Sequence, residues 1–287
     1  MQSMNFLDEL NLAGVLAACL VAMLLGAWLA RKQARAFKGQ THNGHPAVTF
    51  SDYGDMRFLH LDTPAVQGSM KLSQPFDIHL EYVQRMMAWL LFVELHQVPR
   101  LQAMQLGLGA ASLTKFCHHH LKMRTAAVEL NPQVIETCRR WFHLPENSAQ
   151  LNVLLGDAAD IARHPEWQQQ IDVLQVDLYD PEARRPVLDS ADFYRDCHRL
   201  LTPSGCMVVN VFGAASNVNE SIANIKASFG DNSVWAFAPT TAGNSIVLAF
   251  RTPYDVSDSG MLEQARTIEA RWPLPATKWL NALARVA

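Results

Sequence analysis

The chain has 287 residues, of which 49% are hydrophobic, and its formal net charge at pH 7 is −3. This length can bury a large core, as one α/β domain with additions. The slightly negative charge gives no basic field, so nucleic acid is not an expected partner. The five cysteines form no CxxC pair and no zinc-ligand spacing, which indicates reduced thiols in a cytosolic compartment and no metal site.

The N-terminal segment, residues 1–33, contains an apolar run long enough to cross a membrane. Residues 11–30 include no charged side chain, and about twenty apolar residues in a helix span the hydrocarbon core of a bilayer. Asp8 and Glu9 precede the run and basic residues follow it, a charge asymmetry that places the rest of the chain in the cytoplasm. We expect an anchor at the inner face of the cell membrane. The alternatives are a helix buried in an oligomer interface and an extension from a misplaced start codon.

Residues 34–46 are basic and polar and are expected to form a linker. A small β region is expected over residues 47–75, with strands at 47–51, 56–61 and 66–72. A helix is expected over residues 81–95, because Tyr82, Met86 and Trp89 recur at helical spacing. Most of that apolar stripe belongs to the core, whereas Tyr82 and Gln84 are candidates to face a pocket beside the β region.

The stretch from residue 101 to residue 129 is typical of a nucleoside-binding βαβ unit. An apolar strand over residues 101–106 leads into Gly107-Leu108-Gly109, a helix is expected over 110–120, and a second strand ends at Glu129. Gly107 and Gly109 let the backbone pass close to a ligand, and the helix N-terminus offers free N–H groups. Glu129 can accept hydrogen bonds from ribose hydroxyls.

Strands and helices continue to alternate through the rest of the chain, and residues 76–287 are expected to form a doubly wound, Rossmann-like catalytic domain. A helix is expected to start at Asn131-Pro132, with the asparagine as its cap and the proline at its first position, and a later strand and helix are expected over residues 206–212 and 219–229. A third strand over residues 151–155 ends in Gly156-Asp157-Ala158. Asp157 is placed either to bond an adenine amino group or to cap the following helix, and both interpretations stay open. A late hairpin over residues 234–250 adds an antiparallel edge to the sheet.

Two further acids, Asp177 and Asp180, follow the apolar strand over residues 171–176. Open α/β sheets bind ligands at the carboxyl ends of their strands. Two acids there can hold a cationic amine, and one of them can accept its proton. Asp180 lies beside a proline in a turn and can equally be a solvated loop residue.

Three consecutive histidines, His118, His119 and His120, suggest a metal site at first sight. Consecutive helical residues point about 100° apart, so these side chains cannot converge on one ion. We interpret them as the end of a helix, where histidine also suits the helix dipole.

These residues resemble the spermidine synthases, or polyamine aminopropyltransferases, which share the class I methyltransferase fold. The resemblance runs from about residue 66 to residue 251. The motifs that carry it are Val66-Gln67-Gly68-Ser69-Met70, Tyr82-Val83-Gln84, Gly107-Leu108-Gly109, Val128-Glu129-Leu130-Asn131, Gly156-Asp157-Ala158 and Val176-Asp177-Leu178-Tyr179-Asp180-Pro181.

The resemblance implies transfer of an aminopropyl group from decarboxylated S-adenosylmethionine to putrescine, by a protein that is a homodimer or larger. It further implies that Glu129 holds the ribose, Asp157 the adenine, with Ala158 beside it, and that Asp177 deprotonates the attacking amine. Asp180 and Tyr82 are implied to line the amine channel.

The chain departs from this family at the glycine loop and in the acceptor pocket. Gly109 is followed by Ala110, where the family usually has an aspartate that contacts the donor's amine. Lys71 is expected at the position of a family glutamine and Gln84 at that of an acid, which makes a dicationic acceptor less favourable. The alternatives are therefore a methyltransferase that uses intact S-adenosylmethionine and a non-catalytic, membrane-tethered nucleoside-binding protein.

Overall fold

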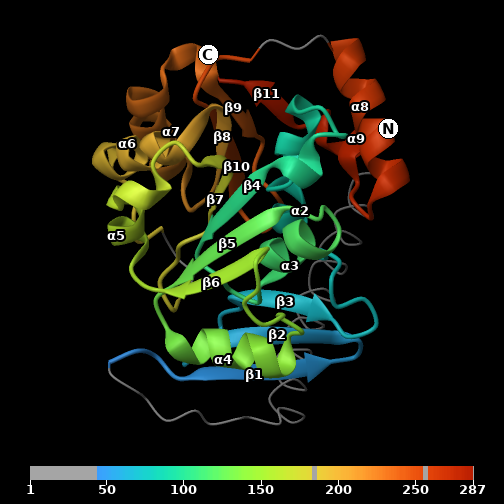
Figure 1. The fold of residues 1–287 in the computed structure, drawn as a ribbon, viewed down its shortest axis with the longest axis vertical. Coiled ribbons are helices and arrows are strands. Elements are labelled where there is room, and N and C mark those ends of the chain that lie inside the picture. Colours follow the sequence, from blue (N-terminus) through green and yellow to red (C-terminus); the bar gives the residue numbers. More distant parts are fainter. Residues whose placement is uncertain (1–43, 183–185, 255–257, 287) are drawn as a thin grey trace, which may run out of the picture.

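The computed structural model describes residues 44–182, 186–254 and 258–286 (Figure 1). Within these residues the centre is an eight-stranded sheet in the order β11-β9-β10-β8-β7-β4-β5-β6. Neighbouring strands are parallel from β6 to β8. These parallel strands are β4 (Gln102–Leu106), β5 (Arg124–Glu129), β6 (Leu151–Leu155), β7 (Ile171–Val176) and β8 (Leu201–Phe212).

An antiparallel edge completes the sheet beyond β8. It consists of β9 (Val234–Phe237), β10 (Asn244–Phe250) and β11 (Leu283–Arg285), and β9 and β10 pair as the expected hairpin. The predicted doubly wound sheet with an antiparallel edge is therefore confirmed. β11 is an addition that the sequence pattern did not reveal.

Helices cover both faces of this sheet (Figure 1). One face carries α3 (Ser112–His119), α4 (Pro132–Trp141), α8 (Asp258–Arg271), α9 (Ala276–Trp279) and the 3₁₀ helix η1 (Ala88–Phe92). The other face carries α5 (Ala158–Arg163), α6 (Ala191–Leu200) and α7 (Ala215–Phe229). Three short 3₁₀ turns lie in the connections: η2 (Val98–Arg100), η3 (Pro165–Trp167) and η4 (Asp231–Ser233).

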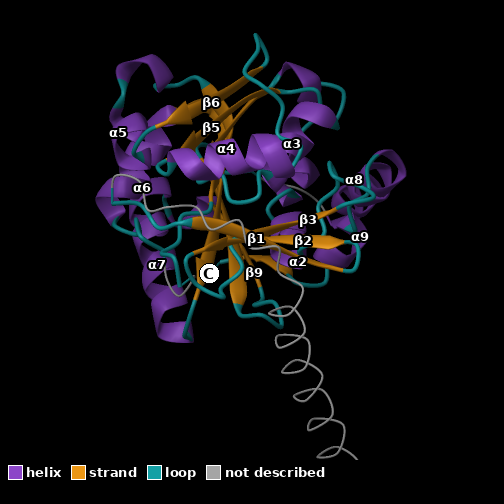
Figure 2. Ribbon diagram, turned by 90° about the horizontal axis from the view of Figure 1, so that it is seen from below, coloured by secondary structure: helices purple, strands orange, loops and turns teal. Residues whose placement is uncertain are grey.

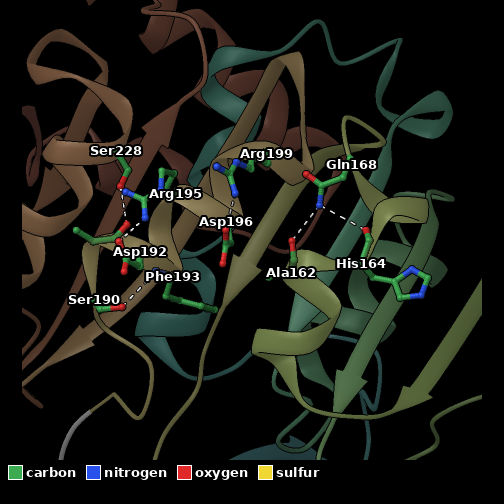
Figure 3. Close-up of polar contacts among 11 residues, drawn as sticks. Ala162, His164, Gln168, Ser190, Asp192, Phe193, Arg195, Asp196, Arg199 and Ser228 are labelled. Carbon is green, nitrogen blue, oxygen red and sulfur yellow. Dashed lines mark hydrogen bonds and ion pairs between the residues drawn. The ribbon is translucent and has the colours of Figure 1, made fainter.

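The helix starts follow the local sequence chemistry. Asn131 Oδ1 accepts the Gln133 N–H at 3.0 Å and Pro132 occupies the first turn of α4, the expected cap. At α6, Ser190 Oγ accepts the Phe193 N–H at 3.2 Å (Figure 3). The ion pairs Asp192–Arg195 and Asp196–Arg199 decorate the same helix, and such exposed pairs add little stability.

The small β region forms a separate three-stranded antiparallel sheet in the order β1-β2-β3. Its strands are β1 (Val48–Tyr53), β2 (Met56–Leu61) and β3 (Gly68–Lys71), close to the predicted positions. One face of this sheet packs on α4, where Phe50 contacts the rings of Trp141 and Phe142. Figure 2 shows the small sheet lying across the end of the main domain, next to α4.

The predicted helix over residues 81–95 is wrong beyond its first turn. The structure has α2 (Glu81–Arg85) and then the separate 3₁₀ helix η1. All of residues 86–92 are buried, so the run is core on every side rather than one apolar stripe of a surface helix. Gln175, buried in β7, donates its side-chain amide to the Met86 carbonyl at 3.1 Å. This hydrogen bond satisfies a buried carbonyl that has no partner within α2, because the helix ends there.

Other boundaries differ less. β8 begins at Leu201 rather than Cys206, with an irregularity in its pairing to β7, and α7 begins at Ala215 rather than at residue 219. The apolar run at residues 11–30 lies outside the described residues. Within the described part of the chain, no helix combines the length and the apolar character that a membrane crossing requires.

Candidate functional site

A cavity of about 740 Å³ opens at the carboxyl ends of β4, β5, β6 and β7. β4 is paired with β5 on one side and with β7 on the other, so the chain changes direction across the sheet at this point. Ligands of open α/β sheets bind at such a switch point. The residues that follow these four strands form much of the cavity wall: Gly107, Gly109, Glu129, Leu130, Gly156, Asp157, Ala158, Asp177, Tyr179 and Asp180.

The glycine turn is built by close backbone contacts. Gly107 has φ +91°, and a Cβ placed on it would lie 2.3 Å from the Asp177 carbonyl oxygen. Gly109 has φ +50°, and a Cβ there would lie 2.8 Å from the Gln67 carbonyl oxygen. Both positions therefore exclude side chains, and the two glycines bring the turn against the Asp177 loop and the small β region at once.

The carboxylate of Glu129 is held by the backbone. Its Oε1 accepts the Asn131 N–H at 2.8 Å and its Oε2 accepts the Leu108 N–H at 3.2 Å. Burial raises the pKa of this carboxyl, and the hydrogen bonds from Asn131, Leu108 and Leu130 oppose that rise. Glu129 thus links the glycine turn to the start of α4 and presents a fixed acceptor to the cavity.

Asp157 has the capping geometry that the sequence allowed. Its Oδ1 accepts the Ala159 N–H at 2.7 Å at the start of α5. The residue is exposed and also lines the cavity beside the buried Ala158. The capping interpretation is confirmed, and a second role toward an adenine amino group is compatible with the same position.

Asp177 lies at the centre of the cavity wall, between the end of β7 and the end of β8. Asn210 Nδ2 donates to Asp177 Oδ1 at 2.9 Å, and the Tyr82 hydroxyl adds a second hydrogen bond. Burial raises the pKa of Asp177 to about 6, and the hydrogen bonds from Asn210 and Tyr82 limit that rise. Burial and the nearby Asp177 carboxylate raise the pKa of Tyr82 well above its usual range, so its hydroxyl stays a donor.

The loop that carries Asp180 is fixed to the small β region. Gln67 Nε2 donates to the carbonyl oxygens of Asp180 and Pro181 at 3.2 and 2.9 Å, and Thr63 Oγ1 donates to the latter at 2.7 Å. Asp180 and Gln67 both line the cavity. The small sheet therefore closes one side of the site.

Two predicted pocket residues lie elsewhere. Lys71 Nζ donates to Gln74 Oε1 at 3.0 Å and approaches Asp55 at 4.0 Å, and Gln84 Nε2 donates to the Ile78 carbonyl at 2.8 Å. Neither is part of the cavity wall. Gln84 follows Tyr82 by two positions on a helix, so the two side chains point in opposite directions. The ammonium of Lys71 consequently does not oppose a cationic acceptor.

Among the polar residues of this wall that sequence reasoning missed are Gln67, whose amide holds the Asp180 loop, Asn210 and Asn244. Asn210 could have been found, because it is the one polar residue among the apolar positions 206–212 of β8. Nothing in the sequence signals that Asn244, in a different strand, lies beside it.

Two of the three histidines, His119 and His120, tie the segment that follows the small β region to the end of α3. The His119 ring stacks on Phe76 with ring centroids 4.0 Å apart, and His120 Nε2 lies 2.9 Å from Asp77 Oδ1. Among the described residues no group of three or more histidine, cysteine or acidic side chains is arranged to hold a metal ion.

A family model and a curated relative both point to one family of proteins. The family model described as the spermine/spermidine synthase domain matches residues 97–255. A polyamine aminopropyltransferase of Chromobacterium violaceum is 31% identical over 240 residues, which cover 83% of this chain and 89% of that protein.

Solved structures share the fold. A probable spermidine synthase from Corynebacterium glutamicum superposes with a TM-score of 0.65 at 19% identity, over 81% of this chain and 86% of that one. Human methyltransferase-like protein 13, solved in complex with SAH, superposes with a TM-score of 0.60 at 24% identity, over 67% of this chain and 92% of that one. At these identities the two structures speak for the architecture alone.

Proposed function

The chain belongs to the spermine/spermidine synthase family, and we propose that it transfers an aminopropyl group from decarboxylated S-adenosylmethionine to putrescine or a related small amine. The observation that carries this proposal is the carboxylate of Asp177. It stands at the switch point of the sheet, and Glu129, Asp157, Tyr82 and Asp180 line the same cavity. Such a placement suits a carboxylate that takes the proton of an amine bound beside the nucleoside.

The nucleoside half of the proposed site consists of the glycine turn, Glu129, Asp157 and Ala158. Glu129 already uses its oxygens on two backbone donors, and each oxygen keeps a lone pair for the ribose hydroxyls. Gly107 and Gly109 line the same cavity, and their close backbone packing brings the turn to which the donor would bind against the Asp177 loop. In this proposal Asp157, which is exposed and lines the cavity, accepts a hydrogen bond from the adenine amino group.

The amine half consists of Tyr82, Asp177 and Asp180. An amine attacks only through its lone pair, and an aliphatic amine is mostly protonated at neutral pH. Asp177, with a pKa raised to about 6, is ionised at pH 7 and is still a better base than an ordinary aspartate. It takes the proton while the amine nitrogen bonds to the propyl carbon and the carbon–sulfur bond of the sulfonium breaks, which releases methylthioadenosine.

A second candidate is methyl transfer from intact S-adenosylmethionine. One observation favours it: Ala110 and Ala111 are buried after the glycine turn, so the loop brings no carboxylate to the ammonium of a decarboxylated donor. The free N–H groups at the start of α3 suit a donor carboxylate instead. A non-catalytic nucleoside-binding protein is the third candidate.

Product analysis separates these candidates. We expect the protein to convert decarboxylated S-adenosylmethionine and putrescine into equal amounts of methylthioadenosine and an aminopropylated amine. Intact S-adenosylmethionine with the same amines should give no product. Formation of S-adenosylhomocysteine and a methylated amine would establish the second candidate, and binding of methylthioadenosine without turnover the third.

We also propose that the catalytic part is cytoplasmic, is tethered to the inner face of the cell membrane through residues 11–30, and forms a homodimer. The uninterrupted apolar run and the basic residues that follow it support the tether. The resemblance to an oligomeric family supports the dimer. Light scattering of a variant that lacks residues 1–33 tests the dimer, and sedimentation of the full-length protein with membranes tests the tether.

A further inference from the structure

Two amides, the buried Asn210 and the half-buried Asn244, extend from Asp177 along the strands that carry the sheet away from the glycine turn. Asn210 lies near the end of β8 and is only 4% exposed. Its Nδ2 donates to Asp177 Oδ1 at 2.9 Å, and its Oδ1 accepts from Asn244 Nδ2, at the start of β10, at 3.0 Å. The three side chains form one hydrogen-bonded row from β10 across β8 to the end of β7.

This row has a direction. An amide that was turned over at Asn210 would place its carbonyl oxygen against the Asp177 carboxylate and its NH₂ group against the NH₂ group of Asn244. Both contacts are unfavourable, so the donor on Asn244 fixes which end of the Asn210 amide faces Asp177. The Asn210 backbone is held as well, because Tyr179 Oη donates to its carbonyl at 2.8 Å.

We propose that Asn244 and Asn210 are a positioning pair for the transfer reaction, which holds a fixed N–H donor on Asp177 and so sets the orientation of its carboxylate and the pH at which it becomes a base. Neither residue acts as an acid or a base itself. This inference rests on the proposed function of Asp177, and it adds that the antiparallel edge of the sheet takes part in catalysis through Asn244.

The surroundings of Asp177 make this donor important. Tyr82 faces it from α2, and Tyr179 and Asp180 come from its own loop, whereas the neighbours from β8 and β10 are the two uncharged amides. Within the described chain, no lysine or arginine is among the residues that line the cavity. Hydrogen bonds are therefore what opposes the rise in pKa that burial causes.

A double-mutant cycle tests the pair. Asn210→Ala removes the donor, and Asn244→Ala leaves the donor in place but releases its orientation. The titration midpoint of Asp177 is read from the ¹³C signal of its carboxyl group, which Asp177→Asn assigns, and the acidic limb of the kcat/KM profile with putrescine is measured in parallel. Gln105→Leu is the matched control, since Gln105 is a buried amide of β4 that bonds Gln175 and Cys117 instead.

We expect Asn210→Ala to raise the Asp177 midpoint by about one pH unit, because a hydrogen bond to a charged group is lost. Activity should fall at pH 7 and recover by about pH 8.5. Asn244→Ala should raise the midpoint in the native background and leave it unchanged in the Asn210→Ala background. The control should lower the melting temperature without moving the midpoint.

The proposal is overturned if Asn210→Ala leaves the midpoint unchanged, or if Asn244→Ala shifts it equally in both backgrounds. It is also overturned if the lost activity does not return at high pH, since that result indicates a structural role only. If Asn210→Ala does not fold, the shift caused by Asn244→Ala alone decides. Failure of the proposed function is a separate result, because the carboxyl titration needs no turnover. If the protein transfers no aminopropyl group but Asn210→Ala still shifts the Asp177 midpoint, the proposed function is refuted and the positioning pair is retained.

Discussion

Asp177→Asn should make the folded protein more stable at neutral pH while it removes the proposed base. The carboxyl has an ordinary pKa of 3.8 and a pKa of about 6 in the folded chain, because burial disfavours its charged form. The folded state therefore binds the proton more tightly than the unfolded state does. The native protein gains stability as the pH falls from above 6 toward 4, and above pH 6 the ionised carboxylate costs stability.

The size of this cost follows from the difference between the two pKa values. About two pKa units at about 1.4 kcal/mol each give roughly 3 kcal/mol above pH 7. This figure is an upper limit, since the carboxylate faces the cavity, where water also reaches it. The isosteric amide keeps an oxygen for the Asn210 donor and carries no charge, so Asp177→Asn should recover most of the 3 kcal/mol, equivalent to roughly 6–12 °C in Tm.

Thermal unfolding of the native and Asp177→Asn proteins at pH 7.5, 6 and 4.5 measures the effect. The difference in Tm should be largest at pH 7.5 and should nearly vanish at pH 4.5. Asp160→Asn serves as the control, because Asp160 is an exposed carboxylate of α5 paired with Arg163. If the two proteins have the same Tm at pH 7.5, or if their difference in Tm does not change with pH, the argument that the buried, ionised Asp177 carboxylate destabilises the folded protein is refuted.

Three further predictions concern other parts of the chain. Glu129→Ala should weaken binding of methylthioadenosine, measured by calorimetry, by about 1.5–3 kcal/mol for each hydrogen bond lost to the charged carboxylate, and Asp157→Ala should cost less because an adenine amino group is neutral. Gln175→Leu should lower the free energy of unfolding, measured in urea, by about 1–3 kcal/mol, because the buried Met86 carbonyl loses its partner. The same variant should raise KM for the amine, because the loss lets the segment around Met86 move and Tyr82 lies on that segment. The full-length protein should sediment with membranes and resist carbonate extraction, and removal of residues 1–33 should release a folded, soluble protein; native protein that stays in the supernatant would favour a buried interface helix.

The parallel part of the fold could be predicted because each strand is a short apolar run that ends in a chemical signal. β6 was placed at its observed residues, since Gly156 follows it, and the start of α4 was fixed by Asn131 and Pro132. These are local rules, in which the residues that define an element are adjacent in the sequence. The same reasoning placed Gly107, Glu129 and Asp177 at one edge of the sheet, where the structure brings them together.

The failures arose where the answer depends on distant residues. The helix over residues 81–95 breaks because Met86 meets Gln175, 89 positions later, in a core that is apolar on every side. The side on which Lys71 lies depends on how the small sheet docks on the main domain. Asn244 joins the site through strand pairing between β8 and β10, which no local pattern in either strand reveals.

The central claim is that Asp177 is the base of an aminopropyl transfer, and the rate of a single turnover with decarboxylated S-adenosylmethionine and putrescine tests it most directly. Asp177→Asn should lower this rate by about 10²–10⁴-fold, the usual contribution of a positioned general base, while the Kd for methylthioadenosine stays nearly unchanged. A variant that turns over within a few-fold of the native rate would contradict the account.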